Sequence, residues 1–339
     1  MRFAFSEDQK LLRDGVRDML ATECTADRVR DAWGAKQGRV EGLWAKLAEL
    51  GVVGLRASEA AGGMGLDELD LVLLLEETGY AALPEPIVEH TAVALPLLES
   101  LRGGDAQVKA AAEGGLLLTV GLECSPHVNH ASSADLMILQ KDDSLHLLER
   151  DAVETRAQRS VDHSRKLSTV QWQPTTESRL ARGPEAEREI ARALNRGTLG
   201  SAAQLVGLAR RMLDMTVEYV QQREQFGRPI GSFQALKHML ADTLLGIEVA
   251  RPVVYRAAYT LSGDRSEQDV HTSMAKVYAA EAAHRAARTA LQCHGAIGYS
   301  FEHDLHLWMK RVWAVSSDWG EPRWHRERVA RAKVDGDRT

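Results

Sequence analysis

Two long stretches with helical periodicity are separated by the sequence Arg223-Glu224-Gln225-Phe226-Gly227-Arg228-Pro229-Ile230, which Phe233-Gln234 follows closely. The helical pattern begins after Glu185 and continues to about Ala332. Glycine-containing breaks interrupt it at residues 227–232, 263–266 and 295–300. Long helices joined by short loops favour an antiparallel bundle, so residues 181–339 are predicted to form a C-terminal four-helix bundle domain.

The N-terminal part, residues 1–112, is also predicted to be helical. Ser6 and Gln9 have the spacing of a capping box, and apolar residues then recur on one helical face. Asp67 can cap a second helix that contains the apolar run from Leu69 to Leu75. This run is too short to cross a bilayer.

The middle part, residues 113–180, has a different pattern and is predicted to be a small, reduced β domain. Short β-prone runs alternate with polar turns at residues 116–120, 136–139, 145–148 and 167–172. The predicted fold is therefore mainly α with a small β insert. With 339 residues, the chain is long enough for two or three such units.

Composition excludes several classes of protein. Hydrophobic residues make up 44% and charged residues 27%, as in ordinary globular proteins. The net charge is -6, and the arginines between Arg323 and Arg331 alternate with acids, so neither nucleic acid nor a membrane is a predicted partner. Glu7, Asp8 and Lys10 stand where a signal peptide needs apolar residues, and a cytoplasmic protein is expected.

No metal site is predicted. The cysteines Cys24, Cys124 and Cys293 lack the spacing of metal ligands and are interpreted as free thiols. His303 and His306 could share a helix face, but no further ligand has suitable spacing. Four tryptophans near the C-terminus are interpreted as packing or subunit-contact residues: Trp308, Trp313, Trp319 and Trp324.

Two motifs make the chain similar to the acyl-CoA dehydrogenase family. Residues 223–234 resemble the family's Arg-x-x-Phe-Gly-x-x-Ile...Phe-Gln segment. Residues 292–299, Gln-Cys-His-Gly-Ala-Ile-Gly-Tyr, resemble its Gln-x-x-Gly-Gly-x-Gly-Tyr loop, with Ala296 in place of one glycine. The resemblance extends over nearly the whole chain and implies an FAD-dependent enzyme that oxidises an acyl-CoA thioester.

The resemblance also assigns cofactor-binding roles. In the family these two segments reach across a subunit interface to FAD held mainly by the neighbouring chain. Arg223 would then bind the dianionic pyrophosphate, and Phe226 would offer an apolar face to adenine. The remaining candidates are two amides and two glycines that allow close backbone approach: Gln234, Gln292, Gly295 and Gly298.

The chain departs from the family at the catalytic base. A carboxylate must remove the α-proton while the β-hydrogen leaves as hydride to the flavin. At the two places where the family carries this carboxylate, the chain has Gly197 and Gly320. Glu321 is one residue away and is a weak candidate, since an acid at a helix start before Pro322 also has an ordinary structural explanation.

The middle domain departs from the family as well. The flavin-facing turn and strand are missing, because Leu118 to Glu123 run almost directly into Ala134 to Leu136. A chain that keeps the segments donated to a neighbour and loses its own wall and base resembles the shortened subunit of the α2β2 acyl-CoA dehydrogenases of actinobacterial steroid catabolism. A longer subunit is the expected partner and a steroid-derived acyl-CoA a possible substrate; the electron acceptor is not specified.

Two alternatives remain open. The first is a self-sufficient homomeric acyl-CoA dehydrogenase that uses Glu321 or another displaced carboxylate. The second is a structural or interaction protein without enzymatic activity on the same scaffold. Retention of Arg223, Phe226, Gln292 and Gly295 together disfavours the second, since a purely structural protein has no need of them.

Overall fold

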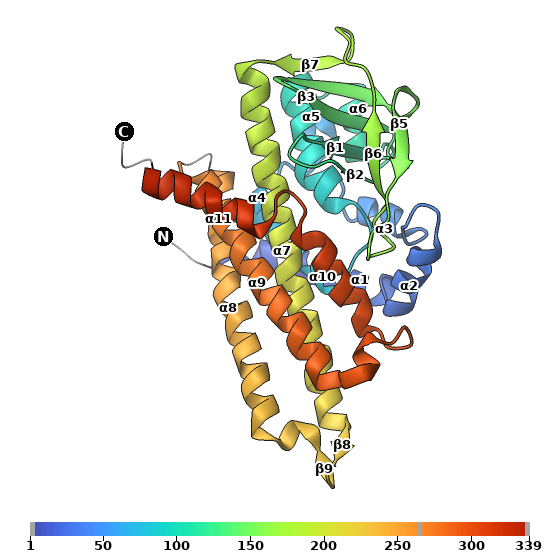
Figure 1. Cartoon of the computed structure of the whole chain (residues 1–339). Coiled ribbons are helices and arrows are strands. Elements are labelled where there is room, and N and C mark those ends of the chain that lie inside the picture. The colour runs from blue at the N-terminus through green and yellow to red at the C-terminus, as the bar shows by residue number, and fades with distance from the viewer. Residues whose placement is uncertain (1–3, 264–265, 336–339) are drawn as a thin grey trace.

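A computed structural model describes residues 4–263 and 266–335 of the chain (Figure 1). The predicted break at residues 263–266 lies partly outside these residues. The N-terminal part consists of helices with short turns between them: α1 (Glu7–Glu23), α2 (Ala26–Gly34), α3 (Leu43–Glu49), η1 (Glu59–Ala61), α4 (Glu68–Tyr80), η2 (Val88–Ala94), α5 (Leu95–Arg102) and α6 (Ala106–Ala112).

Helix starts in this part follow the local sequence. Ser6 accepts a hydrogen bond from the Gln9 backbone and the Gln9 side chain bonds back to Ser6, so the predicted capping box at the start of α1 is confirmed. Asp67 caps α4 through the backbone N–H groups of Leu69 and Asp70. Segment η2 is a π-helix, a rare form that often occurs at functional sites.

The middle part contains two small sheets. One has the strand order β1-β3-β4-β7, with β1 parallel to β3 and the other pairs antiparallel; the second is antiparallel with the order β2-β6-β5. Their bounds are β1 (Leu118–Gly121), β2 (Val128–Asn129), β3 (Leu136–Lys141), β4 (Ser144–Glu149), η3 (Arg150–Ala152), β5 (Glu154–Ala157), β6 (Leu167–Gln171) and β7 (Arg179–Arg182).

Four of these strands were expected from the sequence: β1, β3, β4 and β6. The others lack a strong apolar pattern, since β5 and β7 are largely exposed and β2 has only two residues. Strand β7 extends two residues past the predicted domain boundary at residue 180 and leads directly into the bundle.

The C-terminal part is a helical bundle in which α9 packs along both α7 and α8 (Figure 1). Its elements are α7 (Pro184–Gln222), β8 (Glu224–Gln225), β9 (Arg228–Pro229), η4 (Ile230–Ser232), α8 (Gln234–Ser262), α9 (Gln268–His294), η5 (Gly295–Tyr299), α10 (Leu305–Ser316), α11 (Pro322–Ala330) and η6 (Arg331–Asp335). The sheets lie beside the start of α7, and the β8-β9 hairpin lies at the opposite end of that helix.

One large apolar core joins the N-terminal helices, the β1-β3 region and the bundle. A second, smaller cluster with Val128, Met137 and Val153 lies between the two sheets. Close helix packing depends on small residues, because a side chain at Gly79 or Gly207 would collide with the backbone of the facing helix. Within the described ranges, no helix combines the length and the apolar character that a membrane span requires.

Candidate functional site

The predicted Arg223 segment is a hairpin that projects from the end of the bundle. Arg223 is the C-cap of α7, where its N–H donates to the Tyr219 carbonyl. Phe226 occupies the tight turn between β8 and β9 with a φ of 56° and is 92% exposed. This exposure leaves the ring available for contact with another molecule.

The second predicted segment lies beside the first. The His294 ring, directly before Gly295, stacks on Tyr219 at a centroid distance of 4.2 Å, which joins the end of α9 to the end of α7. Gln292 and Gly295 are exposed, whereas Gly298 is buried. The structure therefore brings together two motifs that are about seventy residues apart in the sequence.

Gln234, the first residue of α8, is exposed at the same end of the bundle. Next to it, Phe233 supports the hairpin through an edge contact with Phe226 and a cation-π contact with Arg228, whose guanidinium carbon is 4.1 Å from the ring centroid. The Arg223 guanidinium is exposed and makes no ion pair with any residue that the structure describes. Arg223 is therefore available to an external anion.

The two base positions of the resemblance, Gly197 and Gly320, both lie next to Trp319. The Trp319 indole covers Gly197 so closely that a β-carbon there would collide with the ring. Gly320 has a φ of 103°, which strains any other residue, and a β-carbon there would lie 2.8 Å from the His325 ring. Neither position can carry a carboxylate without rearrangement of the loop.

Hydrogen bonds from α7 and α11 hold the loop that carries Trp319 in place. The backbone carbonyl of Trp319 accepts hydrogen bonds from the His325 ring (3.0 Å) and from the Thr198 hydroxyl (3.3 Å). Trp319 itself has a φ of 56°, a conformation that costs about 1 kcal/mol or more for a residue with a side chain. These contacts explain how the loop keeps the indole on Gly197.

Lys276 of α9 is fully buried beneath this loop and was not predicted from the sequence. Its ammonium group donates to three acceptors, each at 2.8 Å: the Ser201 hydroxyl and the carbonyls of Val315 and Asp318. Burial lowers the pKa of Lys276 to about 7, with Asp318 opposing and Arg165 reinforcing the shift. Lys276 thus connects α9 to the end of α10 and to the loop.

Lys276 should make stability depend on pH. Its pKa is about 7 when folded and about 10.5 when unfolded, so the unfolded chain binds the extra proton between these values. The free energy of unfolding of the wild type should therefore rise with pH from 7 to 10, relative to Lys276→Met, by up to about 1.4 kcal/mol per pH unit. Urea titrations of both proteins across this range measure the difference, and parallel pH profiles would contradict it.

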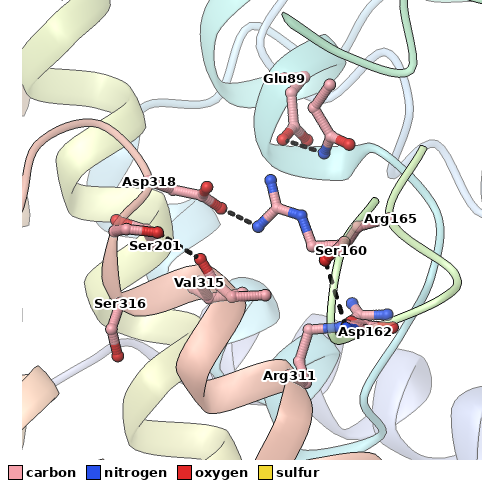
Figure 2. Close-up of polar contacts among 12 residues, drawn as sticks. Glu89, Ser160, Asp162, Arg165, Ser201, Arg311, Val315, Ser316 and Asp318 are labelled. Carbon is pink, nitrogen blue, oxygen red and sulfur yellow. Dashed lines mark hydrogen bonds and ion pairs between the residues drawn. The ribbon is translucent and has the colours of Figure 1, made fainter. Parts of the chain in front are cut away.

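Next to Trp319, a cleft of about 720 Å³ separates the sheets from the α10-α11 turn. Arg165 crosses its floor and forms an ion pair with Asp318, while Glu89 from the π-helix accepts a hydrogen bond from the Asn129 amide at 2.6 Å (Figure 2). Glu321 is exposed at this cleft as the N-cap of α11 and makes no capping hydrogen bond.

Below the cleft, Arg311 of α10 connects three segments. It pairs with the buried Asp162 and donates to the Leu83 carbonyl and the Ser164 hydroxyl, both at 2.6 Å (Figure 2 shows the Asp162 pair). Asp162 is fully buried and also accepts from Ser164. The N-terminal helices, the β5-β6 connection and the bundle are thereby held together.

The tryptophans, histidines and cysteines that the sequence analysis considered take part in packing or line the cleft. Trp308 is buried and donates to the Tyr80 carbonyl, whereas Trp313, Trp319 and Trp324 line the cleft. His303 contacts the His294 ring and His306 lies between Trp33 and Phe301. The cysteines Cys24, Cys124 and Cys293 are free thiols.

Comparison with known proteins identifies the family. Residues 6–112 match the acyl-CoA dehydrogenase N-terminal domain, and residues 188–333 match the acyl-CoA dehydrogenase C-terminal domain. Acyl-CoA dehydrogenase IpdE2 of Mycobacterium tuberculosis is 32% identical over 307 residues, which cover 90% of this chain and 91% of that protein. The chain belongs to the acyl-CoA dehydrogenase family.

Acyl-CoA dehydrogenases are flavoprotein oxidoreductases that use FAD, and the resemblance seen in the sequence is confirmed. IpdE2 of Mycolicibacterium smegmatis is also 32% identical, over 94% of this chain and 96% of that protein. The solved ChsE4-ChsE5 complex from M. tuberculosis contains a chain of the same fold, with a TM-score of 0.88, 23% identity and coverage of 98% of this chain and 100% of that chain. The predicted acyl-CoA dehydrogenase fold is confirmed.

Several residues that line the cleft or lie beneath its loop gave little or no signal in the sequence. Lys276 lies in a helical pattern in which a lysine is normally an exposed residue, and Arg165 lies between strands in a polar stretch. Glu89 follows Pro86 in an apolar segment, where an unexplained acid could have been noticed. Their pairing depends on contacts between distant parts of the chain.

Proposed function

We propose that the chain is a subunit of a heteromeric FAD-dependent acyl-CoA dehydrogenase, to whose cofactor site it contributes Arg223, Phe226, Gln234, Gln292, Gly295 and Gly298. The main support is that both motif segments are exposed together at one end of the bundle, with an exposed Phe226 and with an Arg223 that has no ion pair among the described residues. A site completed within this chain would bury these groups.

The proposed reaction is α,β-dehydrogenation of an acyl-CoA thioester, with the base supplied by the longer partner subunit. FAD, when bound, supplies the acceptor for the β-hydrogen as hydride. Arg223 would neutralise the pyrophosphate, and Phe226 would cover the adenine. In this chain Gly197 and Gly320 carry no carboxylate and the Trp319 indole packs against Gly197, which supports a role without proton abstraction.

The names of related proteins support a heteromer and a steroid-derived substrate. Two neighbours in fold are complexes of two differently named proteins, ChsE4-ChsE5 and the Tcur3481-Tcur3483 steroid acyl-CoA dehydrogenase. We therefore propose an α2β2 assembly with a longer acyl-CoA dehydrogenase subunit. The electron acceptor is left unassigned.

An apolar face on the bundle supports a protein partner. Leu245 and Val249 of α8 and Tyr278 of α9 are exposed in a groove of about 770 Å³, which charged residues such as Arg285 and Arg288 of α9 also line. The α9 side of this groove continues toward Gln292. An exposed patch of this kind favours association with another chain, which would also bring Gln292 to the interface.

Replacement of Arg223 tests the cofactor role. Arg223→Ala should weaken FAD binding in the assembled complex by about 2 kcal/mol or more, since it removes a charge-assisted bond to a partly buried anion. Flavin absorbance after equilibrium dialysis measures the loss. Arg323→Ala is the matched control, because Arg323 is exposed on α11 and its ion pair within the described residues is with Glu327 of the same helix. Unchanged flavin retention in Arg223→Ala would refute the assignment.

Replacement of Glu321 tests the alternative that the chain acts alone. Glu321→Gln should change turnover of the active assembly by no more than a few-fold, whereas loss of a true general base costs about 10²- to 10⁴-fold. A loss of that size with normal flavin content would support a self-sufficient homomeric dehydrogenase. The third possibility, a structural protein, predicts that neither Glu321→Gln nor Arg223→Ala affects activity or flavin.

A further inference from the structure

A pocket at one end of the bundle is lined by residues that the proposed flavin-donating role does not use. Its lining comes from the second half of α8, the start of α9, the segment before α1 and the start of α4. The β8-β9 hairpin lies at the other end of α8. The pocket shares no lining residue with the cleft beside Trp319. Its volume of about 440 Å³ is in the range of small-molecule sites.

Most of the pocket wall is apolar. Phe5, from the segment before α1, meets the Tyr255 ring edge to face at a centroid distance of 4.8 Å. Tyr255 is fixed in turn, because its hydroxyl donates to Glu76 at 2.7 Å. The other apolar and aromatic side chains in the lining are Ala4, Leu69, Pro252, Val253, Tyr259 and Met274. Such a wall favours the apolar part of a ligand over water.

Arg256 of α8 supplies a positive charge to this lining. In the part of the chain that the structure describes, its guanidinium makes no ion pair, and its Nε–H donates to His271 Nε2 at 3.4 Å. The acid near that ring, Glu267, lies 3.9 Å from His271 Nε2 and is itself ion-paired with Lys333. Arg256 can therefore pair with a negatively charged ligand.

Hydrogen bonds hold the Arg256 side chain at the pocket. The Thr260 hydroxyl donates to the Arg256 carbonyl at 2.8 Å, so it accepts from His271 Nδ1–H at 2.9 Å. The Nε2 of the neutral ring is then the acceptor for Arg256 Nε–H. Burial lowers the pKa of His271, which favours this neutral form. Because Nε is engaged, the two terminal amino groups of Arg256 are the donors left for a ligand.

A carboxylate fits this arrangement, because its two oxygens can accept two parallel hydrogen bonds from one guanidinium. One positive charge in a mainly apolar lining also matches one negative charge better than the two of a phosphate. We propose that this pocket binds a monocarboxylate with an apolar chain, which lies among Phe5, Tyr255 and Met274 while the carboxylate pairs with Arg256. The site is independent of the flavin-donating role.

A matched pair of probes tests the proposal by isothermal titration calorimetry on the full chain. Octanoate and octan-1-ol have the same chain length and differ in the charged group. We expect octanoate to bind with a Kd of about 1 mM or lower. It should bind at least about ten-fold more tightly than octan-1-ol, because only the carboxylate can pair with Arg256.

Replacement of the arginine locates the charged contact. Arg256→Met removes the charge and keeps an unbranched apolar stem, so it should weaken octanoate binding by about ten-fold or more and leave octan-1-ol binding unchanged. Arg182→Met, at an exposed arginine of β7, is the control and should leave the affinities for both probes unchanged.

Methyl NMR locates the apolar chain without relying on a variant of the pocket. In a chain labelled at its methionine methyl groups, octanoate should shift the Met274 signal, which Met274→Leu identifies. The signal of Met137, which is buried between the two sheets, should not move. Equal affinities for the two probes, octanoate binding that is unaffected by Arg256→Met, an unshifted Met274 signal, or no octanoate binding would each overturn the proposal.

Discussion

Expressed alone, the chain should fold as a helical protein, retain little FAD and show no acyl-CoA dehydrogenase activity. The groups assigned to FAD, such as Arg223 and Phe226, lie in or next to the β8-β9 hairpin, at the opposite end of α7 from the sheets. Its own base positions are Gly197 and Gly320, and the Trp319 indole packs against Gly197. Coexpression with a longer relative should yield a yellow complex with about one FAD for each pair of unlike chains.

The measurement is flavin absorbance and acyl-CoA turnover of the purified chain, compared with the coexpressed complex. A complex assembled with Arg223→Ala is the matched control, since it keeps both chains and removes only the proposed pyrophosphate contact. A stoichiometric flavin signal with turnover by the lone chain would contradict the heteromeric proposal. It would show that this protein completes its own active site.

Replacement of Arg311 by methionine should lower the free energy of unfolding by about 3–5 kcal/mol. The change would leave the fully buried Asp162 without its charge partner and the Leu83 carbonyl without its donor. Loss of one member of a buried pair is costly, because the remaining charge stays in a low-dielectric environment. Chemical unfolding followed by circular dichroism measures the change.

Arg323→Met is the control for this prediction. Arg323 has a side chain that is 87% exposed and pairs with Glu327 at 3.1 Å, so its loss should change stability by about 0.5 kcal/mol or less. Similar effects of the two substitutions would show that the Arg311 cluster does not hold the three parts of the chain together.

Helix positions and the family could be predicted from the sequence because local signals determine them. The Ser6-Gln9 capping box and the Asp67 N-cap mark helix starts through contacts within one turn. The two motifs that resemble the family's FAD-binding segments are contiguous stretches, so they can be recognised without knowledge of the fold. Strands β2, β5 and β7 were not predicted, because β2 has only two residues and because β5 and β7 are largely exposed and carry no alternating apolar pattern.

The sequence by itself determined that this chain is a mainly helical acyl-CoA dehydrogenase relative with glycines at both expected base positions. Only the tertiary structure decided that Trp319 occupies the space beside Gly197, that Lys276 is buried beneath it, and that Arg165 and Asn129 meet at one cleft. The physical reason is that burial and hydrogen-bond partners depend on side chains from distant segments. A lysine or arginine has the same local pattern on an exposed helix face as beneath a loop, and its surroundings are set only when the segments pack.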